Sequence, residues 1–385
     1  MIRIKSLKEK ALKLHKKLRG KIEIKSKFLI KSPQDLSLIY TPGVAEVSNA
    51  IYLDKKKVYD YTSKWNNVAI VTDGSRLLGM GNLGPEAALP VMEGKAMLFR
   101  QFGKINAFPI CLATQEKHNI IKTVEQIAPV FGAINIEDIE SPKSLEIVEH
   151  LRQELSIPIF HDDQHGTATV VLAALINALK LVKKDLKEAK IVVVGAGAAG
   201  YGIVNILSEV GAKNIVVVDS AGIIYEQRST HMNRYKQEIA RVTNPDKATG
   251  SLEDALKNAD VLICVSGKSN LINKQMIRSM SNNAIVFALT NPIPEIMPED
   301  AKQGGARIIA TGRSDYYNQV NNALIFPFIL RVALDARIPK INEEMLVNVA
   351  KVLAKLQEKK LDEQHILPSI NDTKILPAIR NLIRA

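Results

Sequence analysis

The sequence has few cysteines, few aromatic residues and no long unbroken run of apolar residues. Its two cysteines, Cys111 and Cys264, are far apart, so they predict neither a disulfide framework nor a zinc site, and we expect thiols in a reducing compartment. The most apolar stretch, 191–207, is broken by four glycines and predicts a strand, a turn and a helix rather than a membrane span. The N-terminus has no apolar run typical of a signal peptide. We therefore expect a cytoplasmic protein without a membrane segment.

The positive charge is concentrated at one end of the chain. The formal net charge is +12, and the first 31 residues contain twelve Lys and Arg against two Glu. Apolar residues recur there at helical spacing, at Leu7, Ala11, Leu14 and Leu18. Together with a capping box at Ser6 and Glu9, they predict a packed amphipathic helix with a solvated lysine face. Contact with a membrane surface or a polyanion is the alternative. Because the remaining residues are close to neutral, the charge does not indicate a nucleic-acid-binding groove.

Length and periodicity predict an α/β protein of two domains. The 385 residues exceed the roughly 150 expected of one domain. Apolar segments alternate with helical ones after residue 190, which is typical of a Rossmann-type, doubly wound parallel sheet. Strands are expected at 190–194, 214–218, 261–264, 284–287 and 307–310. We expect a first domain over 1–161, completed by a C-terminal helical segment, 321–385. A dinucleotide-binding domain would cover 162–320.

A glycine-rich turn follows the first of these strands. Its residues are Gly195, Ala196, Gly197, Ala198, Ala199 and Gly200. This G-x-G-x-x-G pattern lies between a strand and a helix, and Asp219 ends the next strand 24 residues after Gly195. The pattern predicts a pyrophosphate at the helix N-terminus and ribose hydroxyls on Asp219, although a structural glycine turn would look similar. Asp219 favours NAD over NADP because it repels a 2′-phosphate, unless Arg228 or a nearby lysine reverses the preference.

Two pairs of acidic residues follow two apolar segments. Glu137 and Asp138 come after the strand expected at 129–136, and Asp162 and Asp163 after 157–160. Carboxylates just beyond neighbouring strands can meet at one sheet edge and form an all-oxygen site for Mg²⁺ or Mn²⁺. Each pair alone could instead be a helix cap or a solvated turn.

Motifs along nearly the whole chain resemble those of the malic enzymes. They are YTPGVA at 40–45, TDGSRLLG at 72–79 with GNLG at 81–84, PVMEGK at 90–95, IED at 136–138, HDDQHGT at 161–167, TNP at 290–292 and NQVNN at 318–322. They occur in the family's order, and the chain has the length of the short bacterial form. One departure is the segment 111–114, CLAT, where the family has an aspartate before the threonine, so the role of this loop is open.

The resemblance implies oxidative decarboxylation of (S)-malate to pyruvate and CO₂ with reduction of NAD or NADP. It also implies Mg²⁺ or Mn²⁺ and a homodimer or higher homo-oligomer. Lys95 would take the proton of the C2 hydroxyl, Asp162 would relay that proton or orient the amine, and Tyr40 would protonate C3. Lys95 must be neutral to act, so we expect the metal, Arg76 and burial to lower its pKa.

The resemblance also implies the ligands of metal, substrate and cofactor. The metal ligands would be Glu137, Asp138 and Asp163. Arg76, Asn291 and Asn322 would bind the substrate carboxylates, and Asn291 would also contact the nicotinamide ribose. Three other functions remain: a malolactic enzyme that makes lactate with bound NAD, another dehydrogenase that shares the nucleotide half, and a non-catalytic NAD sensor or nucleic-acid-binding protein.

Overall fold

The computed structural model describes residues 2–384, with side chains described from residue 7 to residue 382. A four-stranded sheet occupies the first half of the chain. Its strands are β1 (Asn67–Thr72), β2 (Asn106–Cys111), β3 (Ala133–Ile136) and β4 (Ile159–His161), in the order β2-β1-β3-β4 and all parallel. The order reverses between β1 and β3. The carboxyl ends of these two strands therefore flank a crevice, where parallel sheets commonly bind ligands.

Both faces of this sheet are covered by helices, because successive residues of a strand point to opposite faces. Val68 and Ile70 of β1 belong to a core with Phe99 of α5 (Pro85–Gly103). Ala69 and Val71 instead belong to a core with residues of α6 (Lys117–Ile127) and α7 (Lys143–Glu154). A strand buried on both faces carries apolar residues throughout, as expected of a parallel sheet.

A six-stranded sheet occupies the second half. Its order is β10 (Ile308–Thr311), β9 (Ile285–Ala288), β8 (Val261–Cys264), β5 (Ile191–Val194), β6 (Ile215–Asp219) and β7 (Gly222–Ile223). Only β7 among these strands is antiparallel to its neighbour. The helices between the strands are α9 (Ala198–Glu209), α10 (Arg234–Val242), α11 (Leu252–Leu256), α12 (Lys274–Arg278) and α13 (Pro298–Gln303). Here the order reverses between β5 and β8, which gives a second crevice at their carboxyl ends.

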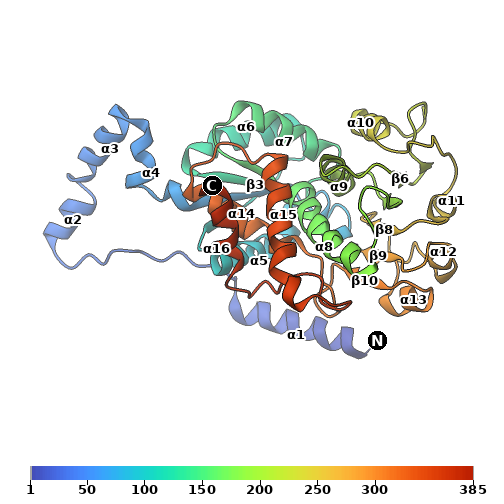
Figure 1. Cartoon of the computed structure of the whole chain (residues 1–385). Coiled ribbons are helices and arrows are strands. Elements are labelled where there is room, and N and C mark those ends of the chain that lie inside the picture. Colours follow the sequence, from blue (N-terminus) through green and yellow to red (C-terminus); the bar gives the residue numbers. More distant parts are fainter. Residues whose placement is uncertain (1, 385) are drawn as a thin grey trace.

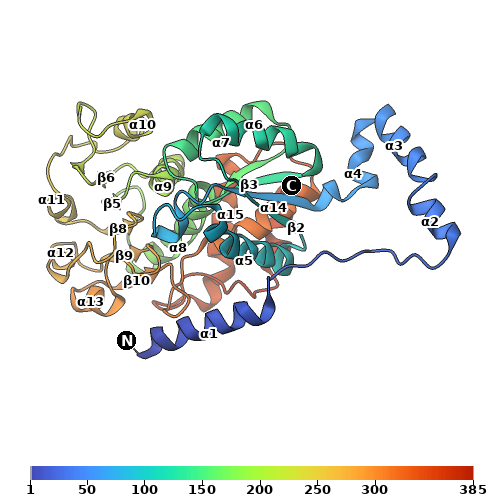
Figure 2. The same ribbon diagram turned by 180° about the vertical axis from the view of Figure 1, so that it is seen from behind.

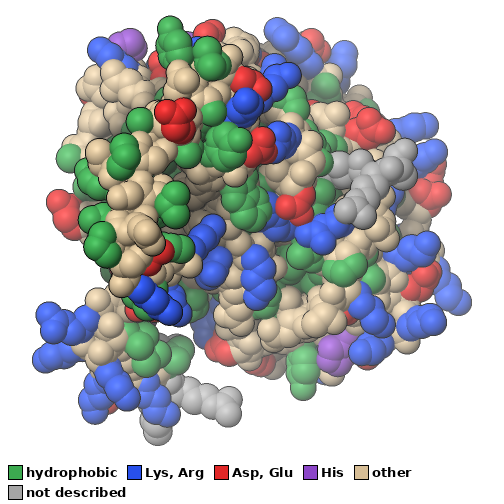
Figure 3. All heavy atoms as spheres, turned by 90° about the vertical axis from the view of Figure 1, so that its left-hand side faces the viewer, with side chains coloured by type: hydrophobic (Ala, Val, Ile, Leu, Met, Phe, Trp, Pro, Cys, Tyr) green, Lys and Arg blue, Asp and Glu red, His purple; other side chains and the backbone are tan. Residues whose placement is uncertain are grey.

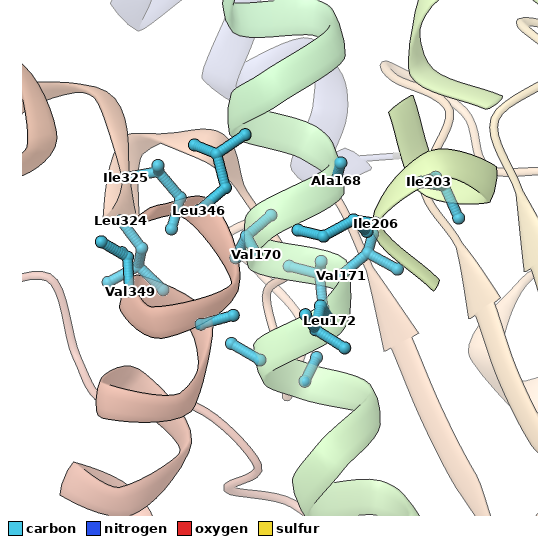
Figure 4. Close-up of a cluster of buried hydrophobic side chains, with 14 of the residues drawn as sticks. Ala168, Val170, Val171, Leu172, Ile203, Ile206, Leu324, Ile325, Leu346 and Val349 are labelled. Atoms are coloured by element: carbon cyan, nitrogen blue, oxygen red, sulfur yellow. The ribbon is translucent and has the colours of Figure 1, made fainter. Parts of the chain in front are cut away.

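Helix α8 (Thr167–Val182) lies between the two halves. Figure 4 shows Val170 turned toward Leu324, Ile325, Leu346 and Val349, while Ala168 and Val171 face Ile203 and Ile206 of α9. The residues on the first side come from the chain around α14 (Phe326–Asp335) and from α15 (Glu343–Gln357). The stretch Asp162–Val182 is long and apolar enough to cross a membrane, but 78% of its apolar window is buried inside the protein. This burial is typical of a helix in the core of the protein.

The C-terminal helices pack back on the first half of the chain. Phe326 of α14 contacts Phe99 of α5 with ring centroids 4.7 Å apart, and α16 (Ile375–Arg384) packs on α14 and α15. The remaining short helices are η1 (Lys55–Lys57), η2 (Ser63–Asn66), η3 (Leu77–Gly79), η4 (Ala128–Val130), the π-helical turn η5 (Asp162–Gly166), η6 (Asn322–Leu324) and η7 (Glu358–Lys360).

The N-terminal part of the chain stands away from this body. Helix α1 (Ile2–Leu18) lies to one side, and an extended segment leads from it to α2 (Pro33–Ile39), α3 (Val44–Leu53) and α4 (Val58–Tyr61) (Figures 1 and 2). We call 33–61 the projecting arm. No residue of its three α-helices, all described, is buried. Figure 3 shows the Lys and Arg side chains of α1 as a projecting lobe and hydrophobic side chains spread over the face that carries the arm.

The mixed α/β fold with parallel sheets is confirmed, and the five strands expected after residue 190 lie within one residue of their predicted positions. The sequence did not predict strands β1 and β2, because their apolar residues could not be told apart from neighbouring apolar segments. The predicted N-terminal helix is present, but it begins at Ile2, before the proposed cap. Its packing was predicted wrongly, because Leu7, Leu14 and Leu18 are exposed in this chain.

Candidate active site

Two adjoining clefts lie where the carboxyl edges of the two sheets face each other. One, of about 420 Å³, is lined by predicted site residues, namely Arg76, Lys95, Glu137, Asp138, Asp163, Asn291 and Asn322. The other, of about 790 Å³, is lined by Gly195, Ala196, Gly197 and Asp219. Arg76, Gly79, Val265 and Gly267 line both. The structure therefore brings the predicted metal and substrate residues next to the glycine-rich turn.

The acidic residues meet because β3 and β4 are parallel neighbours. Ile136 lies opposite His161, so the residues that follow them leave the sheet at the same edge. Oxygens of Glu137, Asp138 and Asp163 all lie within 4.8 Å of one another. The Asp138 backbone N–H also donates to Asp163 Oδ2 at 3.1 Å. This cluster consists of the three residues predicted as metal ligands.

The three carboxylates repel one another in a poorly solvated place. Burial and then the charge of Asp163 raise the pKa of Asp138 to about 7, against the opposing effect of Lys95. Burial also raises the pKa of Glu137 well above its ordinary value. Asp138 has a left-handed backbone conformation (φ 48°), and such strain in a residue with a side chain is concentrated at functional sites. Converging anionic oxygens of this kind fit a hard divalent cation.

Lys95 lies beside this cluster on α5. Its Nζ is 2.6 Å from Glu137 Oε2, it donates to Asp162 Oδ2, and it lies 4.3 Å from the centre of the Phe326 ring. Burial lowers the pKa of Lys95, but the charges of Asp162 and Glu137 outweigh burial and the net pKa is raised. Burial therefore acts in the predicted direction, but the two carboxylates that face the amine outweigh it, and the predicted effects of the metal and Arg76 stay predictions.

Asp162 is buried behind Lys95 and does not line the cleft. Burial raises the pKa of Asp162 to about 6, and Lys95 opposes that rise. Its second oxygen, Oδ1, has no hydrogen-bond partner among the described residues. A Cβ on Gly166 would lie 2.2 Å from that oxygen, so only glycine fits at position 166, four residues after Asp162. Asp162 is therefore in contact with the amine and not with the open cleft.

Arg76 links the two clefts. A Cβ on Gly197 would lie 3.0 Å from Arg76 Nη1, so the guanidinium closely approaches the glycine-rich turn. Arg76 makes no ion pair with any side chain described between residues 7 and 382, and it lines both clefts. Asn291 and Asn322 line the smaller cleft from the loop after β9 and from η6. These groups have the donors that a dicarboxylate would need.

The glycine-rich turn has the close backbone contacts that its sequence predicts. Gly195 has φ 113°, and a Cβ there would lie 2.7 Å from the carbonyl oxygen of Val265. A Cβ on Gly200 would lie 1.9 Å from the carbonyl oxygen of Gly195. The N-terminus of α9 follows this turn, and its unpaired N–H groups favour an anion.

Asp219 is paired with two cations. Arg228 donates to it at 2.9 and 2.5 Å, and Lys236 at 2.7 Å. Burial alone would raise the pKa of Asp219, but hydrogen bonds from Arg228 and Lys236 lower it to about 2. Arg228 is buried, whereas Lys236 lines the larger cleft. The sequence had indicated that Arg228 or a lysine could modify the cofactor preference, but it did not identify Lys236.

Tyr40 is the predicted site residue that is not with the others. It directly follows α2 on the projecting arm, its side chain is 65% exposed, and it lines neither cleft. Sequence reasoning also missed Phe326, which packs on Lys95 and has no recognisable motif. It missed the loop 265–268 as well, although a serine and a glycine directly after a predicted strand are a signal that could have found it. Cys111 ends β2 and lines neither cleft.

A glycine turn at one switch point and a carboxylate–lysine cluster at the other define a dinucleotide-dependent dehydrogenase with an acidic substrate site. The family model "Malic enzyme, N-terminal domain" matches residues 19–152, and "Malic enzyme, NAD binding domain" matches 164–378. The chain therefore belongs to the malic enzyme family. It is an NAD(P)-dependent, decarboxylating malate oxidoreductase.

Several relatives resemble the chain along its length. The "Bifunctional malic/malolactic enzyme" of Bacillus subtilis is 50% identical over 379 residues, which cover 98% of this chain and 92% of the relative. The "NAD-dependent malic enzyme" of Geobacillus stearothermophilus is 48% identical over 99% of this chain and 79% of its own. The crystal structure of a Thermotoga maritima NAD-dependent malic enzyme has a TM-score of 0.93 and 48% identity, and covers 97% of this chain and 99% of its own. Further relatives at 41–44% identity are named NADP-dependent malic enzymes.

The raised pKa values of the cluster predict an unusual pH dependence of stability. Asp138 has a pKa of about 7 in the folded chain, against 3.8 ordinarily. The folded state therefore binds more protons than the unfolded state between these values, and the free energy of unfolding falls as pH rises toward 7. Urea unfolding of protein in a chelator, at pH 5, 6, 7 and 8, measures this fall. Asp138→Asn should flatten it, and an unchanged slope in that variant would contradict the assignment.

Proposed function

We propose that this chain oxidises (S)-malate and decarboxylates the product to pyruvate and CO₂ while it reduces NAD or NADP. The supporting observation is that Lys95 touches Glu137 at 2.6 Å in a cleft that shares Arg76 and Gly267 with the dinucleotide cleft. A base, an anion-binding arginine and a hydride acceptor can then meet at one carbon atom. Oxidation at C2 with proton removal from its hydroxyl needs this combination. We place the reaction in the cytoplasm, where the two free thiols stay reduced.

Lys95 and Asp162 would act as a pair in proton transfer. The amine faces the cleft, and the buried carboxylate behind it receives one of its hydrogen bonds. Burial raises the pKa of Asp162 to about 6, so it is a stronger proton acceptor than an ordinary aspartate, but it can take a proton from Lys95 only when the raised pKa of the amine falls. The amine can then take the proton of the C2 hydroxyl. If Glu137 were engaged as a metal ligand, Lys95 would keep one carboxylate partner instead of two, and its pKa would fall.

Glu137, Asp138 and Asp163 would hold Mg²⁺ or Mn²⁺. Three carboxylates with oxygens within 4.8 Å fit such an ion, and it would favour the ionised forms of Glu137 and Asp138, whose pKa values burial raises. When bound, a divalent cation supplies Lewis-acid stabilisation of negative charge on substrate oxygens. Arg76 would hold a substrate carboxylate through its two-pronged guanidinium, and Asn291 and Asn322 would donate hydrogen bonds to the substrate.

Tyr40 would serve a second copy of this chain as the acid that protonates C3. Its exposed phenol lies on an arm without buried residues, and that arm exposes Leu36, Leu38, Ile39, Tyr52 and Leu53. A surface of this composition is typical of a protein interface. A homodimer would cover it and bring Tyr40 to the partner's cleft. We expect neither nucleic acid nor membrane as a partner.

The cofactor we propose is NAD, with NADP as a possible second one. Asp219 stays ionised at the end of β6, where the second ribose of a dinucleotide is recognised. Arg228 is buried and its donors point to Asp219 and to the carbonyls of Gly222 and Ile223, so it is not free for a 2′-phosphate. Lys236 lines the cleft and is the group that could bind such a phosphate.

A malolactic reaction is the second candidate. The observation that favours it is the bifunctional name of the Bacillus subtilis relative. Lactate would then form from malate without net release of reduced cofactor. Absorbance at 340 nm, followed together with lactate and pyruvate, separates the two reactions.

The central test is turnover of malate by the purified chain. With Mn²⁺ and NAD we expect pyruvate and NADH in equal amounts, and removal of the metal by a chelator should stop the reaction. Lys95→Ala should lower kcat by about 10²–10⁴-fold, since this is the range for a lost general base. Absence of both products with either cofactor would refute the proposal.

The position of Tyr40 predicts complementation between two defective chains. Tyr40→Phe and Lys95→Ala should each be nearly inactive, whereas a mixed dimer contains one site with both intact residues. Random pairing would restore about a quarter of the wild-type activity, because about half the dimers are mixed and each has one working site. Co-refolded variants can be assayed against each parent. If activity never exceeds that of the parents, Tyr40 does not act in a partner's site.

The pairing of Asp219 predicts a change of cofactor preference. Asp219→Ser removes one negative charge and leaves Lys236 without its carboxylate partner. The ratio of kcat/KM for NADP to that for NAD should rise by about tenfold or more, as expected when one charge repulsion is lost. The double variant Asp219→Ser, Lys236→Ala should lose most of that gain. An unchanged ratio in the single variant would mean that Asp219 does not face the ribose.

A further inference from the structure

Glu295 is a buried carboxylate outside both clefts. Its side chain is fully buried, and it makes no ion pair with any described Lys or Arg. A buried charge is costly unless hydrogen bonds satisfy it, and an apolar residue would avoid that cost. The position therefore suggests a function that a neutral side chain cannot perform.

Four hydrogen bonds satisfy this carboxylate, and all come from two loops. Ser266 donates to Oε1 from its backbone N–H and from its hydroxyl, both at 3.1 Å. Thr290 donates from its hydroxyl to Oε1 at 2.5 Å and from its backbone N–H to Oε2 at 3.1 Å. Ser266 follows β8, and Thr290 follows β9. Glu295 thus links the loops that leave two neighbouring strands.

The hydroxyls of Ser266 and Thr290 also accept hydrogen bonds from backbone N–H groups of the loop after β8. Thr290 Oγ1 accepts from the Gly267 N–H at 3.0 Å, and Ser266 Oγ accepts from the Lys268 N–H at 3.1 Å. Each hydroxyl therefore gives its proton to Glu295 and uses a lone pair for a backbone N–H. A glutamate side chain offers two acceptor oxygens for these four hydrogen bonds, whereas the amide of glutamine has one acceptor atom.

The linked loops line the two clefts. Val265 and Gly267 line both, Ser266 and Lys268 line the dinucleotide cleft, and Thr290 and Asn291 line the substrate cleft. We propose that Glu295 is a positioning residue that fixes the dinucleotide-binding loop 265–268 relative to the substrate-binding loop 289–291. The inference rests on the proposed function, because it assumes that malate and a dinucleotide occupy these clefts together. Loss of Glu295 would then weaken both binding sites at once.

Asp260 offers a matched control at the opposite edge of the same sheet. Its carboxylate accepts from the Lys190 N–H at 2.8 Å, from the Ser281 hydroxyl at 2.6 Å and from Lys184 Nζ at 2.5 Å. It therefore joins the segments before β5 and β9, just as Glu295 joins those after β8 and β9. Asp260→Asn should lower the melting temperature without changing either binding constant.

The experiment compares Glu295→Ala, Glu295→Gln and Asp260→Asn with the wild type. NADH affinity is measured by fluorescence titration without malate, and KM for malate and the melting temperature are measured alongside. Glu295→Ala should raise both the Kd for NADH and the KM for malate by about tenfold or more, since small misplacements of positioning groups have effects up to about 100-fold. Glu295→Gln keeps one acceptor atom, so it should raise the same two constants by about three- to tenfold, as expected for one lost hydrogen bond.

Two results would overturn the inference. In the first, the Glu295 variants keep the Kd for NADH and the KM for malate within about twofold of the wild type, which is less than the effect of one lost hydrogen bond. In the second, Asp260→Asn raises both constants as much as the Glu295 variants do. If Glu295→Ala does not fold, Glu295→Gln decides by the same criteria. A wild-type chain that fails to bind NADH or to turn over malate contradicts the proposed function instead.

Discussion

The contact of Lys95 with Asp162 and Glu137 is the interaction on which the rest of the active site depends. Four carboxylates are crowded at this edge of the sheet, and burial raises the pKa of three of them: Glu137, Asp138 and Asp162. Lys95 is the amine that faces this group, and its charge opposes each rise. A cluster with so many anions is stable only with cations nearby, so the carboxylates that would hold the proposed metal ion also hold the amine of Lys95 in position.

The topology explains why such residues meet although they lie far apart in the sequence. Each sheet reverses its strand order once, and each reversal opens a crevice at the carboxyl ends of the strands. Helix α8 packs against both α9 and α15, so the two crevices are held face to face by one apolar interface (Figure 4). Arg76 and Gly267 then belong to both clefts.

The sequence predicted those parts of the site that depend on local order. Gly195 and Asp219 are separated by one strand–helix–strand unit, and Glu137 and Asp163 follow adjacent parallel strands, so spacing alone brings them together. It could not predict pairings across the tertiary structure. Phe326 reaches Lys95 from a helix more than 200 residues away, and Lys236 reaches Asp219 from α10. The sequence also did not show that two carboxylates would face Lys95 and raise its net pKa, because this depends on which charges lie closest in three dimensions.

Tyr40 shows a different limit. A motif identifies the residue, but it contains no information about which copy of the chain completes which site. The arm has no buried residues in its helices, and the extended segment before it leads away from the body (Figures 1 and 2). A short arm of this composition has too little core of its own to hold a position by itself. In the proposed homodimer, the partner's surface would hold the arm and Tyr40, which does not line the chain's own cleft. Catalysis would then depend on association, so activity would be lost on dilution below the dimer's dissociation constant even with every residue of the cleft intact.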